Sequence, residues 1–520
     1  MKRRNFIKIS GLSTGTVLTG GTAAGFLASC SGCNKEHHIG LMTEAVTVTE
    51  GDFSRLLSYP AQAGANHTLT AQATVANIKG TNIPLLGYQP NSLLGPSFRI
   101  NRGDVMNVLL QNNLSEHTNI HWHGLKIPAL MDGHPDQLAS AGGTFRYQFT
   151  INQRAGLSWY HPHPHEMTGK QVFQGLAGMF IINDTEEAAL SLPSGQYELP
   201  LVIQDKRISS NGITYNPSME EVMAGYMGES IIVNGIYSPY TEVATRYYRL
   251  RILNGSNARI YRLAFLNGKE RLSYMVIGTD GGLIERPEKV SEAFIAPGER
   301  LDVLFDAGQA QPGDDVFLKS LAFDAMENEG EAGSMPGMGE STSRLEMGAA
   351  FNILKLSVIT GARVMARLPN TLSVITPIAL DGARKRNIKL SLKGMTFLIN
   401  GRRFNMDEIA FDVKRGSKEI WSISNPKLGM PHPIHLHGFA FQVLERLQSP
   451  KQISALAKFG KGRTVSDLGW KDTVLVWPGE TVRVAIDFTH DFPGDQTYMV
   501  HCHNLEHEDA GMMINYRVVG

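Results

Sequence analysis

Hydrophobic and polar residues alternate in short runs along much of the chain. The segments "FRINRGDVMNVLLQNNL" (98–114) and "FDVKRGSKEIWSISNP" (411–426) each predict a strand, a turn with a basic residue and glycine, and a second strand. A similar strand pair, "RYYRLRILNGSNARIYRLAF", occupies residues 246–265 in the middle third. Alternation of this kind is typical of strands with one buried face. Each pair could open a β-sandwich domain, and long amphipathic helices are hard to find.

Two longer segments repeat one layout. "FTINQRAGLSWYHPHPHEMTGKQVFQGLAGMFII" (149–182) and "FTHDFPGDQTYMVHCHNLEHEDAGMM" (488–513) each contain a strand, a glycine turn, an aromatic strand and a histidine cluster. Self-similarity on this scale favours repeated sandwich domains. We therefore predict an all-β chain of three domains, 44–190, 195–362 and 378–520, with a linker ahead of the third.

The first 43 residues are expected to lie outside the fold. Arg3 and Arg4 precede a weakly apolar, glycine-rich stretch that resembles a twin-arginine export signal and is a poor membrane span. It ends at Cys30, in a context that resembles the lipobox at which a bacterial lipoprotein is cleaved and acylated. We expect residues 1–30 to be this signal and residues 31–43 to be a polar tether. An ordinary cleaved signal or a cytosolic leader is the alternative.

Composition narrows the class of function. The 520 residues include 49 basic and 49 acidic side chains without a basic stripe, so nucleic-acid binding is excluded. The 53 glycines and 24 prolines fit a β protein with many turns. Of the three cysteines, Cys30 and Cys33 belong to the leader or tether, which leaves Cys502 alone in the folded body. No internal disulfide is therefore expected, and Cys502 is either a small buried side chain or a functional thiolate.

The histidines are grouped in a way that chance does not explain. Seventeen histidines scattered over this length would give about half of one H-x-H pair, and the chain has five. They lie in four motifs: "HWHG" (121–124), "HPHPH" (161–165), "HPIHLHG" (432–438) and "HCH" (501–503). Residues i and i+2 of a strand share a face, so each pair can hold two metal ions of one cluster. Four such pairs suit several coppers better than a single zinc.

Cys502 faces away from its neighbours if His501 and His503 face the cluster. It then lies at a separate site, and one thiolate, two imidazoles and a weak thioether are the ligands of a blue-copper electron-transfer centre. His507 and Met512 follow at five and ten residues, and His432 is the spare imidazole of the third motif.

With these motifs in this order, the chain resembles the multicopper oxidase family, and within it bacterial laccases and periplasmic cuprous oxidases. The resemblance covers essentially all of the mature chain. It implies three cupredoxin-like Greek-key domains and four copper ions, with a trinuclear cluster between the first and third domains. It implies these ligands: His432, Cys502, His507 and Met512 for type 1 copper; His121 and His435 for type 2; and His123, His161, His163, His437, His501 and His503 for the type 3 pair. His165 is left over, with an outer-shell or solvent role.

The resemblance also implies a mechanism. A phenolic, organic or metal-ion donor gives single electrons to the type 1 copper, and O2 is reduced to water at the cluster. The family pattern assigns proton relays to Asp132 and Glu508, although either carboxylate could instead orient a ligand. We expect a monomer exported to the periplasm or cell envelope, with a lipid anchor at Cys30 if the lipobox is used.

The substrate is where the resemblance is thinnest. The methionine-rich insertion of cuprous oxidases looks absent from residues 390–406, and Leu428 stands where an acidic partner of Met430 is expected. A loop at 323–348, which we expect to be exposed, carries Met326, Met335, Met338 and Met347 and could replace it, but nothing in the sequence brings it near type 1 copper. A laccase-like oxidase is the main hypothesis, a cuprous oxidase for copper tolerance is the alternative, and a non-enzymatic cell-envelope scaffold is the remote one.

Overall fold

The computed structural model describes residues 51–327, 345–361 and 368–520, all within one compact unit, Val48–Gly520. The predicted export signal, lipobox and tether, together with Met335 and Met338, lie outside the described residues. The described residues form mainly strands with a few short helices, so the all-β prediction is confirmed. None of the helices in this part of the chain has the length and hydropathy needed to span a membrane.

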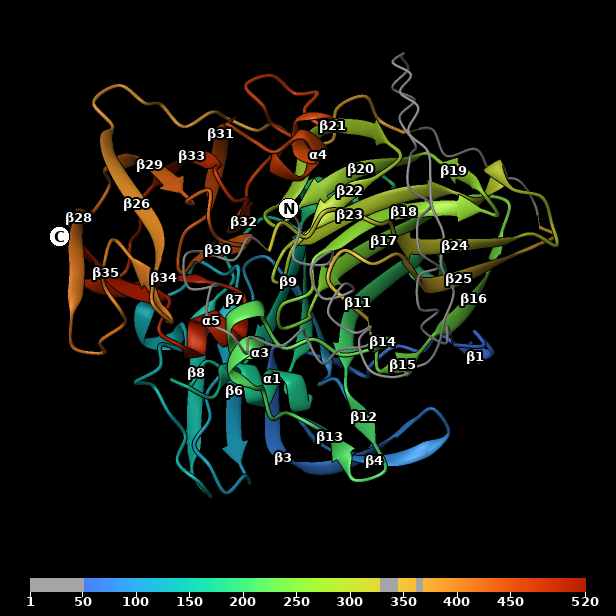
Figure 1. Ribbon diagram of the computed structural model, residues 1–520, viewed down its shortest axis with the longest axis horizontal. Coiled ribbons are helices and arrows are strands. Elements are labelled where there is room, and N and C mark those ends of the chain that lie inside the picture. Colours follow the sequence, from blue (N-terminus) through green and yellow to red (C-terminus); the bar gives the residue numbers. More distant parts are fainter. Residues whose placement is uncertain (1–50, 328–344, 362–367) are drawn as a thin grey trace, which may run out of the picture. The chain divides into compact units, whose positions relative to one another are not determined.

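Three pairs of sheets follow one another along the sequence (Figure 1). The first pair spans residues 62–183 and is drawn in blue to teal. The strands of one sheet are, in spatial order, β2 (Gln62–Ala63), β5 (Ser97–Asn101), β10 (Gly178–Asn183), β9 (Gly156–His161) and β7 (His121–His123). The strands of the other are β4 (Thr81–Gly87), β3 (Asn66–Ile78), β6 (Val105–Asn112) and β8 (Thr144–Thr150).

The second pair lies between residues 198 and 359, except for one short strand contributed by residues 55–56. The strands of one sheet are, in spatial order, β15 (Ile236–Tyr237), β14 (Ser230–Val233), β11 (Glu198–Lys206), β17 (Tyr247–Asn254), β23 (Arg300–Asp306), β20 (Tyr274–Thr279) and β21 (Gly282–Val290). The strands of the other are β1 (Arg55–Leu56), β16 (Pro239–Ala244), β25 (Phe351–Ile359), β24 (Asp315–Ser320), β18 (Tyr261–Asn267) and β19 (Glu270–Leu272), and β22 (Ala293–Ile295) also pairs with β18. A separate hairpin joins β12 (Ile208–Ser209) to β13 (Gly212–Ile213).

The third pair spans residues 384–519 and carries two histidine motifs. The strands of one sheet are, in spatial order, β27 (Thr396–Ile399), β26 (Arg384–Lys393), β29 (Lys418–Ser424), β33 (Thr481–Asp487) and β31 (Phe441–Leu447). The strands of the other are β28 (Ile409–Lys414), β35 (Met513–Val519), β34 (Gln496–Cys502), β30 (His432–Leu436) and β32 (Thr473–Val476). Short helices connect the strands: α1 (Thr168–Gln174), α2 (Thr185–Ala188), α3 (Met219–Ala224), α4 (Lys451–Ser454) and α5 (Leu505–Asp509).

The three pairs share a topology. In each, one sheet contains a parallel pair followed by an antiparallel neighbour, as in β3–β6–β8, β11–β17–β23 and β26–β29–β33. The other sheet contains the same sequence of pairings in β5–β10–β9, β16–β25–β24 and β28–β35–β34. The two strands of each predicted strand–turn–strand segment therefore lie in different sheets and cross the sandwich. The repeat seen in the sequence is a repeat of the whole fold.

A separate hydrophobic core accompanies each pair of sheets. In the first, Trp122 packs against Phe98, Tyr147 and Tyr160. Trp122 lies between His121 and His123 on β7, and its burial among aromatic rings turns the two histidines to the opposite face of the strand. The core thus determines where the histidines point.

Candidate metal centre

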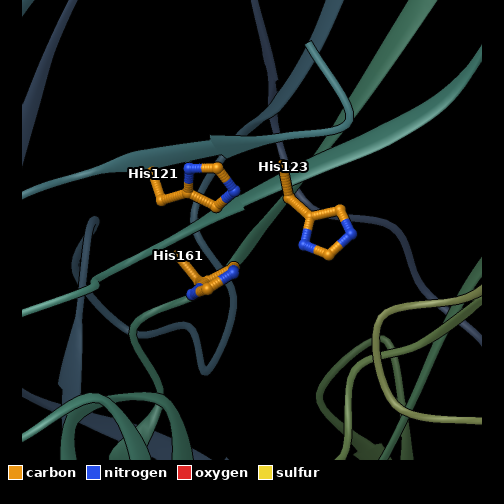
Figure 2. Close-up of side chains that lie close together, drawn as sticks. All are labelled: His121, His123 and His161. Atoms are coloured by element: carbon orange, nitrogen blue, oxygen red, sulfur yellow. The ribbon is translucent and has the colours of Figure 1, made fainter. Parts of the chain in front are cut away.

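Strand pairing brings the four histidine motifs together. On β7 and β9 His121 is the register partner of His161, and on β30 and β34 His435 is the partner of His501. Figure 2 shows His121 and His123 projecting from one strand, with His161 beside them on the neighbouring segment. The ring centroids of His121 and His123 are 5.6 Å apart, as are those of His501 and His503. The expected i, i+2 geometry is therefore present.

Eight histidines from the first and third pairs of sheets form one buried cluster. Groups of three with converging ligand atoms include His121, His123 and His161; His121, His435 and His437; and His163, His437 and His501. His503 completes the set, with its ring 4.9 Å from that of His123 and 5.4 Å from that of His161. All eight are at most 1% exposed.

The outer nitrogens of these rings are held by oxygen acceptors. His121 Nδ1 donates to the carbonyl of Asp132 at 2.7 Å, and His437 Nδ1 to the Asp132 carboxylate at 2.7 Å. His435 Nδ1 lies 2.9 Å from the carbonyl of Asp472, and His501 Nδ1 lies 3.0 Å from the carbonyl of Cys502. A carbonyl only accepts, so His121, His435 and His501 carry their proton on Nδ1 and present a lone pair at Nε2. His437 has the same tautomer with Asp132 Oδ2 as its acceptor.

Those lone pairs point at one another. His121 Nε2 lies 3.3 Å from His435 Nε2, and His437 Nε2 lies 3.0 Å from His501 Nε2. Burial holds the pKa of His121 and His437 well below the ordinary value and that of His501 at about 3, so a proton does not relieve the repulsion. Two facing lone pairs at this distance need a cation between them, and neutral imidazole is a ligand for copper.

Cys502 belongs to a second group of ligands on the other face of β34. Its Sγ lies 3.5 Å from Nδ1 of His432 and 3.5 Å from Nδ1 of His507, and the two nitrogens are 3.2 Å apart. Three ligands placed about 2.0 Å from an ion in a trigonal plane are about 3.5 Å apart, so these atoms fit one metal ion. The fully buried Met512 lies in the same hydrophobic cluster, and its carbonyl accepts a hydrogen bond from Cys502 N at 3.0 Å.

A bound cation would change the charge state of this second group. Burial raises the pKa of the Cys502 thiol well above its ordinary value, because nothing positively charged in the described chain compensates a thiolate there. His507 Nε2 donates to the carbonyl of Met223 in α3 at 3.1 Å, which leaves the Nδ1 lone pair facing His432. A bound metal ion would make the thiolate stable and join all three ligands.

The two predicted relay carboxylates are both buried beside the cluster. Asp132 is 1% exposed, and its Oδ1 has no hydrogen-bond partner among the described residues, while Oδ2 accepts from His437. Glu508 is 1% exposed, with Oε2 3.1 Å from His501 Nδ1 and Oε1 3.4 Å from His163 Nε2. Burial raises the pKa of both carboxyl groups. His165 stands apart from the metal-ligating groups, half-buried against Phe404.

Sequence reasoning missed two polar residues that contact the cluster and a third that holds one of them. The Asp472 carboxylate accepts from His123 Nε2 at 3.0 Å, and Thr473 Oγ1 lies 3.2 Å from the same nitrogen. Arg300 donates to both Asp472 oxygens. No motif marks these residues, since the contacts join segments far apart in the chain.

Comparisons with known proteins agree with this chemistry. Multicopper oxidase profiles match residues 70–187 and 372–519. The chain is 32% identical over 459 residues to the multicopper oxidase mco of Staphylococcus haemolyticus, a match that covers 87% of this chain and 88% of that protein. The chain belongs to the multicopper oxidase family.

Other members are similar along most of their length. The laccase of Bacillus subtilis is 33% identical over 486 residues, covering 82% of this chain and 89% of that protein. The crystal structure of McoA, a multicopper oxidase of Aquifex aeolicus, superposes with a TM-score of 0.79 at 37% identity, covering 90% of this chain and 99% of that one. The predicted cupredoxin-like fold is confirmed, and the chain is a laccase-like multicopper oxidase: a copper-dependent oxidoreductase that uses O2.

Proposed function

We propose that the protein is an exported, laccase-like multicopper oxidase that holds four copper ions in two sites and takes electrons from phenolic or other one-electron donors. The assignment of ligands is the one that the resemblance implied. Type 1 copper takes His432, Cys502, His507 and Met512; type 2 takes His121 and His435; the type 3 pair takes His123, His161, His163, His437, His501 and His503.

The observation that carries the proposal is the set of facing lone pairs. Nε2 of His121 faces Nε2 of His435, and Nε2 of His437 faces that of His501. In both pairs the outer Nδ1 atoms are bonded to carbonyl or carboxylate oxygens, so the ring protons do not lie between the facing nitrogens. In the second group His507 Nδ1 presents its lone pair to His432 Nδ1 and Cys502 Sγ. A scaffold that had lost its metal would have no reason to retain this arrangement.

When bound, copper ions would supply one-electron redox chemistry, by which four electrons from the donor and four protons convert O2 to two molecules of water. The chain supplies the connection between the two sites, because Cys502, the last residue of β34, lies between His501 and His503 in the sequence. It also excludes water. The Trp159 ring lies 4.2 Å from that of His161 and 5.5 Å from that of His503, which seals this side of the cluster with apolar surface.

Protons reach the cluster through Asp132 and Glu508 in this proposal. Each carboxyl is buried within hydrogen-bonding reach of a histidine, and burial favours its protonated form. A carboxyl whose pKa is raised holds its proton to a higher pH than usual, and it can transfer that proton and then be reprotonated. Asp132 has the further task of orienting His121 and His437.

Oxygen consumption by the purified, copper-loaded protein tests the proposal. We expect consumption of O2 with a phenolic donor and no accumulation of hydrogen peroxide. Rates with ferrous and cuprous ions, measured in the same buffer, then rank the donors. A copper-loaded protein that consumes no O2 with any of the three donors would refute the oxidase and favour the non-enzymatic scaffold.

A second candidate is oxidation of cuprous ion, and one observation favours it. A small cavity beside the predicted type 1 site is lined by Glu327, Met347 and Met430, together with Pro431 and Pro433, which flank His432. Thioethers are ligands for cuprous ion, and a carboxylate can help to hold it. Residues at both ends of the 323–348 loop therefore contribute to a cavity at His432, which the sequence alone did not indicate.

Paired substitutions separate the two candidates. Met347→Leu and Met430→Leu conserve volume and remove one thioether each. If cuprous ion is the substrate, both should slow its turnover and spare that of a phenol, whereas the exposed Met219→Leu control should spare both. Equal effects on the two substrates, or none, would count against a dedicated cuprous site.

The remaining parts of the proposal concern organisation and location. We propose that the chain is a monomer, since ligands from its first and third sheet pairs converge within one polypeptide. The proposed domain limits are 44–190, 195–362 and 378–520, in keeping with sheets that span 62–183, 198–359 and 384–519. Residues 1–30 are proposed to direct export to the periplasm or cell envelope, with a lipid on Cys30.

A further inference from the structure

The middle pair of sheets holds no predicted copper ligand, because residues 198–359 contain no histidine. One of its side chains nevertheless reaches the metal centre. Arg300, at the start of β23, is 1% exposed. Its Nε donates to the carbonyl of Leu157 at 2.9 Å, its Nη1 to Asp472 Oδ1 at 2.7 Å, and its Nη2 to Asp472 Oδ2. A single guanidinium thus joins all three pairs of sheets.

Asp472 passes this contact on to two predicted ligands. Its Oδ1 accepts from His123 Nε2 at 3.0 Å, and its carbonyl accepts from His435 Nδ1 at 2.9 Å. With the proton on Nε2, His123 turns its Nδ1 inward, and that buried atom has no partner among the described residues. The position of the Asp472 carboxylate therefore decides which nitrogen of His123 faces the cluster.

Asp132 and Asp472 form a reciprocal pair. The carbonyl of each holds a histidine from its own pair of sheets, His121 for Asp132 and His435 for Asp472. The carboxylate of each holds a histidine from the other pair, His437 for Asp132 and His123 for Asp472.

The two carboxylates differ in their partners. Asp132 Oδ1 has no hydrogen-bond partner in the described part of the chain, whereas both oxygens of Asp472 are engaged by the Arg300 fork. A bidentate guanidinium–carboxylate pair fixes distance and orientation together. Asp472 is built as a rigid support, and Asp132 retains a free oxygen.

We propose that Arg300 and Asp472 are positioning residues: the ligand-free middle sheets supply Arg300 to hold the Asp472 carboxylate, which fixes the His123 ring for assembly of the three-copper cluster. This inference rests on the ligand assignment proposed above. It gives the middle sheets a task in the metal centre in addition to their structural one.

Two glycines show that the clamp is closely fitted. A Cβ on Gly124, whose φ is +84°, would lie 2.6 Å from Arg300 Nη2 and 2.8 Å from Asp472 Oδ2. A Cβ on Gly298, whose φ is +82°, would lie 3.0 Å from a carbon of the His503 ring and 3.1 Å from one of the His123 ring. Both positions need glycine for conformation and for space, so backbone from the first and middle sheets is packed directly on the clamp and the rings.

The test compares the clamp with a matched buried pair elsewhere. Arg446 and Asp467 form a bidentate ion pair, with both N–O distances 2.8 Å, inside the third pair of sheets and without contact to a predicted ligand. Copper uptake by the full chain is measured against a competing chelator for Arg300→Met, Asp472→Asn and Arg446→Met. The blue absorbance of type 1 copper and the near-ultraviolet absorbance of the coupled type 3 pair are recorded on each.

In Asp472→Asn the amide NH2 group cannot accept from Arg300, so the bidentate pair is lost. We expect Arg300→Met and Asp472→Asn to keep the blue absorbance, lose the type 3 absorbance and bind the coppers of the three-copper cluster about 10- to 100-fold more weakly. Arg446→Met should take up all four coppers as the wild type does. Cluster affinity unchanged in the clamp variants, or lowered equally in Arg446→Met, would overturn the inference. If Arg300→Met does not fold, Arg300→Lys is the substitute: it keeps the charge but loses the fork, and wild-type type 3 absorbance in it would overturn the inference. A wild type that binds no copper would instead refute the proposed function.

Discussion

Two substitutions of Asp132 distinguish its role in orienting a copper ligand from its role in transferring a proton. Its Oδ2 accepts from His437 Nδ1 at 2.7 Å, and its carbonyl accepts from His121 Nδ1 at the same distance. Asp132→Asn keeps both acceptors, because the amide oxygen can take the place of Oδ2. Asp132→Ala keeps the carbonyl and removes the side-chain acceptor. The two substitutions therefore differ in one hydrogen bond to one ligand.

The magnitudes follow from burial. In Asp132→Ala the Nδ1–H of His437, a fully buried ring, is left without an acceptor, which costs about 1–3 kcal/mol. At about 1.4 kcal/mol per tenfold, this lowers copper affinity by about 5- to 150-fold. Asp132→Asn should retain wild-type copper affinity and blue colour. Since an amide cannot donate and recover a proton as a carboxyl does, its turnover should fall by about 10²- to 10⁴-fold.

The assay combines a chelator competition for copper with steady-state O2 consumption at saturating phenol. We expect the Asn variant to be loaded but slow and the Ala variant to be poorly loaded. Asp132→Asn with wild-type turnover would show that Asp132 only orients His437. Equal copper loss in the two variants would show instead that the negative charge of Asp132, and not its hydrogen bond to His437, holds the metal.

Three further predictions concern other buried residues. Met512→Leu conserves volume at a fully buried site, so the protein should stay folded and blue. A redox titration should find a higher type 1 potential, because a donor to the oxidised copper is lost. An unchanged potential would mean that Met512 is not a ligand. Glu508→Gln should retain all coppers and lower O2 consumption, and unaltered turnover would exclude a relay through Glu508. Burial lowers the pKa of Lys206 to about 7, so between about pH 7 and pH 10 the unfolded chain binds a proton that the folded chain does not. The free energy of unfolding should therefore rise over this range by up to about 1.4 kcal/mol per pH unit. Thermal unfolding of Lys206→Met should lack this pH-dependent gain, and identical pH profiles for the two proteins would contradict it.

Local sequence pattern predicted which segments form the histidine cluster and the Cys502 group. Strand alternation places Trp122 in the core and its two neighbours at the cluster, and it separates Cys502 from His501 in the same way. Both are consequences of a period of two, which is legible in any short segment. The repeat of aromatic strand and histidine cluster likewise corresponds to equivalent strands, β9 and β34, in two sheet pairs.

Contacts between distant segments could not be predicted in this way. Asp472 and His123 are 349 residues apart, and Arg300 and Asp472 are 172 apart, with no motif to link them. The cavity that brings Met347 close to Met430 depends on how the second and third pairs of sheets pack. Residues 55–56 were expected in the first domain but pair with β16 of the middle sheets. Pairing with the edge strand of a sheet leaves no signal in the local sequence pattern.

Copper content and visible absorbance of wild type and Cys502→Ser, measured on the same reconstituted preparations, decide whether Cys502 binds one copper apart from a three-copper cluster. We expect four coppers per chain and an intense blue colour in the wild type. In Cys502→Ser we expect loss of the colour and of one copper, with three retained, because the serine hydroxyl cannot supply the thiolate while the cluster histidines are untouched. A fully copper-loaded wild type without colour, or a Cys502→Ser variant that remains blue, would show that Cys502 is not a type 1 copper ligand.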